Sequence, residues 1–292
     1  ANRTPGFNFP GHFLELSYER VARGRAIVSM EVGAHCADAD GQLNVGALAL
    51  LADMALASSM RSTVGASARL ATVSMSLQFT GERRVGTLKA DAALDGFVPR
   101  ASKKQGLARV EIRSGGTLIC TGSGTFMLLS QLTAAHPLPR RGSLAKIELP
   151  DVDHLNAAEE AVCARARRAL HEPRDFLSAF WGYAPRKTKT GASCALPNGM
   201  HIGNRVGHAQ GGVTFGLACA TANAALPANW ALAGGSAWYI GPGTGQSLKV
   251  KSKIVHQGLL TAVVHTRIEN DEKRGVLECV TSHARKTVSD TN

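Results

Sequence analysis

The chain repeats its own landmarks in the same order and at nearly one spacing, as a duplicated domain does. Chance similarity rarely preserves four such pairs. The pairs recur at an offset of 160 or 159 residues: Phe79 with Tyr239, Leu88 with Leu248, Gly116 with Gly275, and Cys120 with Cys279.

The length of 292 residues gives room for two domains of about 100–150 residues each. Between the two copies lies a segment with three prolines and the basic pair Arg140–Arg141, which is typical of a linker. We therefore expect domains over residues 1–132 and 153–292, joined by a linker over 133–152.

Each copy contains one apolar segment without Lys or Arg, at 44–58 and at 210–224. Both segments are apolar nearly all round, which is typical of a helix covered on every side. The other elements show the alternation and the β-branched or aromatic enrichment of strands. In the first copy these are 25–32 before the helix and 71–79, 87–94, 106–113 and 117–128 after it; in the second they are 188–196, then 232–240, 247–255, 260–268 and 276–282.

These elements predict an α+β fold in which each copy wraps an antiparallel sheet around one long central helix. One further helix is expected at the start of the second domain. Asp153 is a good N-cap for an amphipathic helix that ends near Pro173 and lies against the outside of that domain.

The composition is that of an ordinary globular protein, with 44% hydrophobic and 19% charged residues. No apolar run reaches the ~18–20 residues of a membrane helix, and the first residues lack a signal-peptide pattern. The six cysteines include no Cys-x-x-Cys pair, which fits reduced thiols in a cytoplasm. No metal-ligand spacing is found. We expect a cytoplasmic protein without a membrane span or a metal.

The net charge of +11 favours an anionic partner: nucleic acid, an anionic membrane or a phosphorylated small molecule. Nucleic acid is disfavoured, because aromatic residues make up only 5% of the chain and the Lys and Arg residues are spread along it without a binding motif.

The first apolar segment holds an aspartate, Asp53, among leucines and methionine, with no cation within one turn. A buried, unpaired carboxylate is costly and normally shifts its pKa or is replaced. Asp53 either faces a solvated stripe or bonds a nearby backbone group, or it is kept in a cleft for chemistry. The pattern alone leaves both interpretations open.

The second apolar segment is preceded by Asn204-Arg-Val-Gly-His-Ala-Gln210-Gly211-Gly212 and continues to a leucine and Cys219. This resembles the signature of hotdog-fold thioesterases of the phenylacetyl-CoA and 4-hydroxybenzoyl-CoA type. That signature is Asn-x-x-Gly-x-x-His-Gly-Gly, four residues, Leu, one residue and an acid. Here Gln210 replaces the His, and Cys219 replaces the acid.

The first copy, aligned in the same way, has the complementary losses. It keeps the acid as Asp53 but has Asp38 for the leading Asn, Asn44 for the His and Val45 for the first Gly of the pair. The helices align at an offset of 166 rather than 160, so the loop after the second helix is expected to be six residues shorter.

The resemblance implies two tandem hotdog domains that form an intrachain pseudo-dimer with one composite site. Asp53 and Thr72 of the first domain would face Asn204, Gln210 and Gly211 of the second. The mirror site would lack its acid and its hydroxyl, because it has Cys219 and Leu232 at those positions.

The resemblance also assigns roles. The Gly211 N–H would stabilise the oxyanion formed when a thioester carbonyl is attacked, and Asp53 would act as general base or as nucleophile. Asn204 would hold the water or the carbonyl, and Thr72 would position Asp53 or the water. A turn or strand role is the alternative for Asn204 and Thr72.

Three further interpretations stay open. Gly211 and Gly212 also fit mere close packing of the backbone. His208, beside the motif, either contacts ligand or is structural. Cys219 fits buried filler better than a nucleophile, because the motif places no histidine to activate it.

The implied substrate is an acyl-CoA, whose phosphates suit the basic chain. Lys249, Lys251 and Lys253, at period two on one strand, put three cations on one side of the sheet and offer a seat for those phosphates. No cofactor is expected. We expect the tandem hotdog chain to form a homodimer.

Two alternatives remain. A hotdog hydratase or dehydratase would need an Asp/His or His/Glu pair, which is not found at the family spacing. A non-catalytic acyl-CoA binder or regulator would not need Asp53 beside the thioester.

Overall fold

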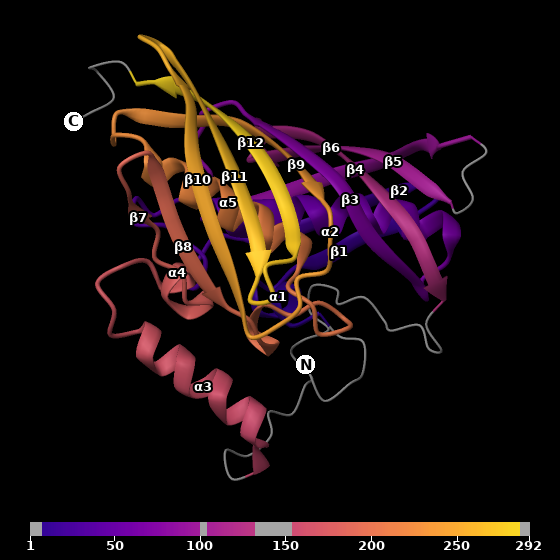
Figure 1. Cartoon of the computed structure of the whole chain (residues 1–292). Helices are drawn as coiled ribbons and strands as arrows, with labels where there is room; N and C mark the ends of the chain where they lie inside the picture. The colour runs from indigo at the N-terminus through magenta and orange to yellow at the C-terminus, as the bar shows by residue number, and fades with distance from the viewer. Residues whose placement is uncertain (1–7, 100–103, 132–153, 287–292) are drawn as a thin grey trace.

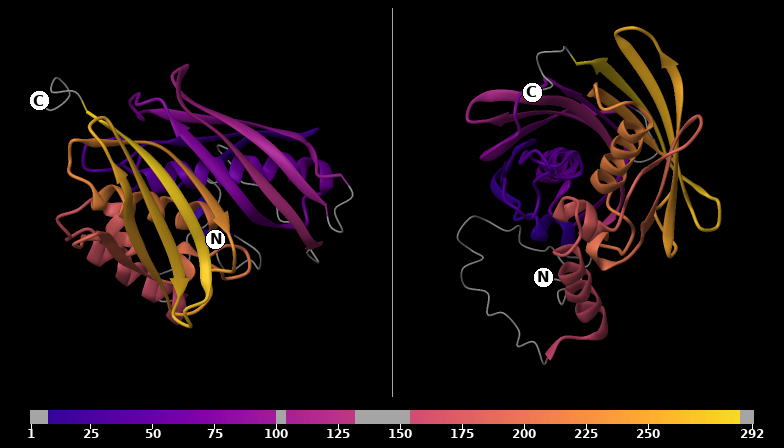
Figure 2. Two further views of the ribbon diagram at one scale, coloured as in Figure 1. Left: turned by 45° about the horizontal axis from the view of Figure 1, so that its top comes forward. Right: turned by 90° about the vertical axis from the view of Figure 1, so that its left-hand side faces the viewer.

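The structure is a computed structural model that describes residues 8–99, 104–131 and 154–286 (Figure 1). The predicted linker over 133–152 lies outside these residues, so the domain boundaries remain a prediction. The described strands form one continuous antiparallel sheet in the order β1-β2-β4-β5-β6-β3-β9-β12-β11-β10-β8-β7. Figure 2 shows this sheet curving around the two long helices.

The two copies of the sequence supply the two halves of the sheet. The first contributes α1 (Phe9–Phe13), β1 (Ser17–Ala22), β2 (Arg25–Glu31), α2 (Val45–Val64), β3 (Ala68–Phe79), β4 (Thr87–Phe97), β5 (Gln105–Ser114) and β6 (Thr117–Gln131). The second contributes α3 (Ala157–Ala169), α4 (Phe176–Trp181), β7 (Arg186–Lys187), β8 (Gly191–Pro197), α5 (Gly211–Ala225), β9 (Trp230–Tyr239), β10 (Ser247–Gln257), β11 (Thr261–Asn270) and β12 (Gly275–Arg285).

Both predicted long helices and all ten predicted strands are present. Five short elements were not expected from the sequence: α1, α4, β1, β7 and the 3-10 helix η3 (Met200–Ile202) between β8 and α5. The predicted helix before the second half is α3, and its N-cap is Asn156, whose side chain accepts from the backbone of Ala158 and Glu159 in a capping box. The expected cap, Asp153, lies outside the described residues.

The helices of the two copies align at an offset of 166 and the strands at 160, and this difference has another cause than the one expected. α2 has 20 residues and α5 has 15, whereas the loops that follow them are of similar length. The second helix itself is shorter, and the loop after it is not.

The halves join where β3 pairs with β9, and the register there is symmetric. Ser76 lies opposite Ser236, its own counterpart at an offset of 160, and Ser74 and Gln78 lie opposite Trp238 and Gly234. When the two copies are swapped at the offset of 160, the Ser74–Trp238 pair becomes the Gln78–Gly234 pair, and the reverse.

The helices α2 and α5 pack against each other at the centre through glycines. A Cβ at Gly212 would lie 2.5 Å from Leu50 Cα, and a Cβ at Gly216 would lie 2.3 Å from Gly46 Cα. These two contacts also exchange at the offset of 166. Because only glycine permits this approach, the start of each helix is held against the middle of the other. No described helix is long and apolar enough to cross a membrane.

Candidate active site

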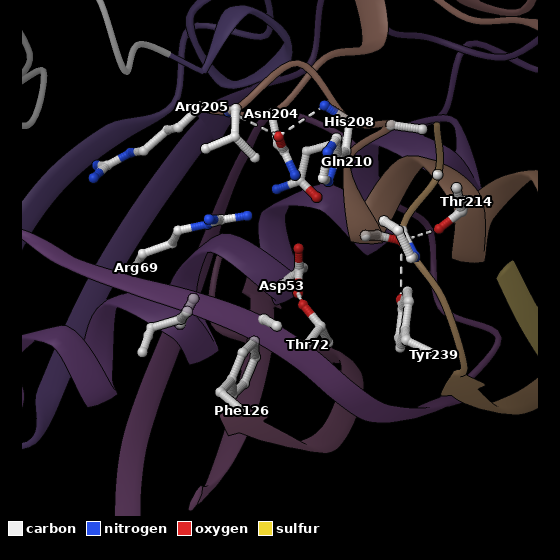
Figure 3. A pocket seen from close by; sticks show the side chains of 18 of the residues that line it. Asp53, Arg69, Thr72, Phe126, Asn204, Arg205, His208, Gln210, Thr214 and Tyr239 are labelled. Atoms are coloured by element: carbon white, nitrogen blue, oxygen red, sulfur yellow. Dashed lines mark hydrogen bonds between the residues drawn. The ribbon is translucent and has the colours of Figure 1, made fainter. Parts of the chain in front are cut away.

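A cavity of about 450 Å³ lies where the middle of α2 and the start of β3 meet the loop before α5 and the end of β9 (Figure 3). Residues from both halves of the chain line it. Asp53 and Thr72 come from the first half, and Asn204, Gln210 and Gly211 come from the second. The structure thus brings together all five residues that the sequence proposed as catalytic.

Asp53 is the buried acid at the centre of this cavity, with 3% of its surface exposed. Thr72 Oγ1 donates to Asp53 Oδ1 at 3.0 Å, and the backbone N–H of Gly212 donates to Asp53 Oδ2 at 3.3 Å. The carboxylate on α2 is therefore held by a hydroxyl from its own half and by an amide at the N-terminus of the other half's helix.

Burial raises the pKa of the Asp53 carboxyl above its usual range. The hydrogen bonds from Thr72, Gln210 and Gly212 and the positive charge of Arg61 oppose this rise without cancelling it. A carboxyl with a raised pKa is a stronger base when ionised, which suits proton transfer near neutral pH.

Gly211 is the first residue of α5, and its N–H has no hydrogen-bond partner among the described residues. A Cβ at this position would lie 3.2 Å from Asp53 Oδ2 and 3.1 Å from Thr72 Oγ1. The peptide that bears this N–H is held by its own carbonyl, that of Gln210, which accepts from the Thr214 N–H at 3.1 Å. The carbonyl of Gly211, in the next peptide, accepts from Tyr239 Oη and from Thr214 Oγ1, each at 2.9 Å. A free, oriented amide at a helix N-terminus beside a buried carboxylate can stabilise a developing oxyanion.

Gln210, which stands where the related signature has His, is the N-cap of α5. Its Oε1 accepts from the Gly212 N–H at 3.1 Å, and its Nε2 lies 3.2 Å from Met54 Sδ. Asn8 Nδ2 contacts the same sulfur at 3.1 Å. Gln210 thus orients the start of the helix, a task that an amide side chain performs without an ionisable group.

Asn204 braces the loop before α5. Its Oδ1 accepts from the backbone of Val206 at 3.0 Å and of His208 at 3.1 Å. Asp38, its counterpart at the offset of 166, accepts from Asp40 and Gln42 in the same positions. Bracing is therefore common to both copies, and only the Asn204 carboxamide nitrogen, which has no partner among the described residues, remains for a ligand.

The remaining sequence candidates divide between the cavity and the outer surface. His208 lines the cavity, and burial, followed by the charge of Arg69, lowers its pKa. Gly212 serves both packing and the hydrogen bond to Asp53. Lys249, Lys251 and Lys253 are exposed on β10, on the side of the sheet away from α5, and none lines the cavity. The alternation correctly predicted that they share one face of the sheet, and this is the face that points to solvent.

Arginines in the cavity were missed by the sequence analysis: Arg61 at the end of α2, Arg69 on β3 and Arg205 in the loop before α5. Figure 3 shows Arg69 reaching across the cavity and Arg205 extending away from Asp53. Isolated arginines at 61, 69 and 205 carry no local pattern, because only the fold brings them together.

The mirror position is filled by protein. Asn44, the counterpart of Gln210, donates to Asp175 Oδ1 at 3.1 Å and to Ser178 Oγ at 3.3 Å. The ring of Trp181 is fully buried against Gly46, and a Cβ added at Gly46 would lie 2.6 Å from it. α4 thus covers the helix start that corresponds to the start of α5.

Cys219, the counterpart of Asp53, is fully buried in the core. A hydrogen bond with Cys279 and burial raise the pKa of the Cys219 thiol well above its usual value. It therefore stays protonated at neutral pH, and a protonated buried thiol is a poor nucleophile.

Comparison with solved structures finds the same architecture along nearly the whole chain. A protein of unknown function with a hot dog fold from Alicyclobacillus acidocaldarius is 10% identical, with a TM-score of 0.58 over 95% of this chain and 97% of its own. The chain has the hotdog fold. No protein-family model matches the sequence, and no curated protein matches it.

Two other hotdog-like structures carry enzyme names. A provisionally named thioesterase from Novosphingobium aromaticivorans is 13% identical, with a TM-score of 0.59 over 93% of this chain and 98% of its own. An acyl-CoA thioesterase II from Mycobacterium marinum is 14% identical, with a TM-score of 0.53 over 96% and 98%. At these identities the likeness is one of fold. In the described part of the hotdog chain, no three His, Cys, Asp or Glu side chains gather as a metal site.

Proposed function

We propose that this chain is an acyl-CoA thioesterase that hydrolyses its substrate to a free acid and coenzyme A. One observation carries the proposal. The buried Asp53 carboxylate of the first half accepts a hydrogen bond from the helix N-terminus of the second half, beside the Gly211 N–H, which has no partner among the described residues. Pure acyl-CoA binding would not require a buried carboxylate with a raised pKa at this point.

In the proposed reaction the thioester carbonyl oxygen faces the Gly211 N–H, and the carbonyl carbon faces Asp53. As a general base, Asp53 removes a proton from water, whose oxygen attacks the carbon. The C–S bond then breaks, its electron pair leaves with sulfur, and the proton passes from Asp53 to the thiolate.

As a nucleophile, Asp53 attacks the carbon itself, and the thiolate leaves and takes a proton from solvent. Water then cleaves the resulting anhydride. Thr72 positions the carboxylate in either route, and Asn204 holds the water or the substrate carbonyl. Neither route requires a cofactor.

The proposal extends to the arrangement of the two halves. The two halves act as the two subunits of a hotdog dimer, with one composite site and a mirror site closed by α4. The symmetric β3–β9 register and the exchanged glycine contacts support this. Cytoplasmic location and assembly of two chains into a homodimer are further proposals, based on the cysteine usage and on the resemblance.

The test measures coenzyme A release from acyl-CoAs of several chain lengths with a thiol-reactive dye. Asp53→Asn should lower kcat by about 10²–10⁴, the usual contribution of a positioned acid–base group. Cys219→Ala, at the corresponding position of the mirror helix, should retain full activity. Release of no coenzyme A from any substrate, or full activity of Asp53→Asn, would contradict the thioesterase proposal.

The same preparations separate the alternatives. A hydratase or dehydratase would add water to, or remove it from, the acyl chain of an enoyl- or hydroxyacyl-CoA without releasing thiol. A binder or regulator would retain acyl-CoA unchanged, with the same affinity in Asp53→Asn as in the wild type.

A further inference from the structure

Two arginines that line the cavity each have a shielded nitrogen without a partner among the described residues. Arg61 comes from the last turn of α2, and Arg205 comes from the loop before α5. The Nη1 atoms of both are shielded from solvent and make no hydrogen bond with any residue that the structure describes. The only hydrogen bond of the Arg61 guanidinium within the described residues runs from Nε to the carbonyl of Ala68, at 3.3 Å.

The two groups repel each other. Burial, followed by the charge of Arg205, lowers the pKa of Arg61 to about 10, and burial lowers the pKa of Arg205. The positive charges of both arginines also act on the buried phenol of Tyr18, where they oppose the rise in its pKa that burial causes. Within the described part of the chain, no carboxylate forms an ion pair with either arginine. Asp53, the acid that affects Arg61, is already bonded to Thr72 and Gly212.

Such an arrangement destabilises the folded chain, since buried charges are costly unless they are paired and hydrogen-bonded. An anionic group of a ligand would remove both the repulsion and the unpaired N–H groups. Guanidinium groups bind carboxylates with two parallel hydrogen bonds and suit this task.

The position of the pair points to the far end of the acyl chain. Arg61 is eight residues after Asp53 on α2, about 12 Å along the helix axis, and Asp53, Ala57 and Arg61 all line the cavity. The apolar side chains of Leu70 and Phe126 line it too. An acyl chain attached to a thioester beside Asp53 can therefore run past apolar groups to the arginines.

The other possible source of the anion is a phosphate of coenzyme A. A volume of about 450 Å³ is at the lower end of ligand pockets, which span roughly 300–1,000 Å³. That volume is small for an acyl chain and the nucleotide of coenzyme A together. The buried Nη1 atoms therefore suit a group at the end of the acyl chain.

We propose that the cavity selects acyl thioesters whose chain ends in a carboxylate, and that Arg61 and Arg205 bind this carboxylate. The proposal rests on the thioesterase function and names its substrate class: coenzyme A esters of dicarboxylic acids.

The experiment compares kcat/KM for pairs of equal chain length: hexanoyl- with adipoyl-CoA, octanoyl- with suberoyl-CoA, and decanoyl- with sebacoyl-CoA. At the preferred length the wild type should favour the ω-carboxylated substrate. Arg205→Gln and Arg61→Gln should lower that preference by roughly ten- to a hundredfold, as expected for lost hydrogen bonds between charged groups. Arg186→Gln, which removes an exposed charge on β7, should leave it unchanged.

Stability supplies a second readout that a merely structural arginine would not give. Because Arg61 and Arg205 are half-buried, with Nη1 atoms that are shielded from solvent and have no counter-ion among the described residues, Arg205→Gln should unfold at the same or a higher temperature than the wild type. A wild type that favours the uncharged substrate at every length contradicts the proposal. So does an equal loss for both members of a pair, which would assign the arginines to the coenzyme A portion.

Binding keeps this test separate from the thioesterase proposal. Free suberate, adipate or sebacate should raise the melting temperature of the wild type and of Asp53→Asn, but not that of Arg205→Gln, whereas the monocarboxylates of equal length should have less effect. If no thioester is hydrolysed, this titration still decides the anion site, and no preference for a dicarboxylate would overturn it.

Discussion

At the scale of single residues, Asp53 shows how far sequence reasoning extends. An acid in an otherwise apolar helix, with no cation within a turn, is costly, and this cost singled it out. The structure adds the partners, Thr72 and the Gly212 N–H, and the cavity that Asp53 lines. Those partners lie 19 and 159 residues away along the chain, so no local pattern specifies them.

The raised pKa of Asp53 predicts a pH-dependent stability difference. A raised folded-state pKa means that the folded chain holds this proton more tightly, so the stability present at low pH is lost as pH rises through the raised pKa. Asp53→Asn, which cannot ionise, should therefore melt at a higher temperature than the wild type at pH 8, and the gap should narrow towards pH 4. Melting curves across this range check it. A gap that is constant, or that widens at low pH, would show that burial does not control this carboxyl.

Gln210 predicts a kinetic effect beyond its helix cap. Gln210→Ala removes one of the two acceptors of the Gly212 N–H, the other being Asp53 Oδ2, and should lower stability by about 1 kcal/mol. It should also reduce kcat/KM by about tenfold, because the start of α5 loses its orientation. The matched control is Asn44→Ala, which removes the counterpart cap on α2. It should lose at least as much stability in urea denaturation and keep its kcat/KM. Equal kinetic losses in both variants would make Gln210 a cap and no more.

Among the secondary-structure elements, those with a pattern that repeats along the segment could be predicted from the sequence. Elements that depend on contacts with distant residues could not. Alternation predicted all ten strands, and apolar composition predicted α2 and α5. The short helices α1 and α4 have five and six residues, too few for a periodic signal. That α4 covers the mirror site depends on Trp181 meeting Gly46, a contact across 135 positions of sequence.

The crossing of α2 and α5 predicts a large effect of one methyl group. In Gly216→Ala the new Cβ would meet the backbone of Gly46 at 2.3 Å, so the helices must move apart. Overpacking of this kind costs about 1–3 kcal/mol, and activity should fall as well because the site spans both helices. Gly96→Ala, where nothing lies within 4 Å of the added Cβ, is the control. Urea denaturation of both variants measures the difference, and equal stability would contradict the close crossing.

At the scale of the whole molecule, the duplication was readable because it preserves order and spacing over 160 residues. The sequence could not reveal what occupies the mirror position, because the residues that fill it come from distant parts of the chain. Cys219 in place of Asp53 suggested an inactive mirror site, and the structure adds that Trp181 and the partners of Asn44 cover the start of α2 at that position. The first half thus supplies the acid and the second half supplies the helix start. Their counterparts, Cys219 and the start of α2, are buried in the core.

If each chain has one composite site, substrate should bind with a stoichiometry of one per chain. Calorimetric titration of Asp53→Asn with an acyl-CoA measures binding without turnover. We expect one molecule bound per chain, with the same value in a Cys219→Ala background. Two molecules per chain would show that the mirror position is open to substrate and would contradict a single composite site.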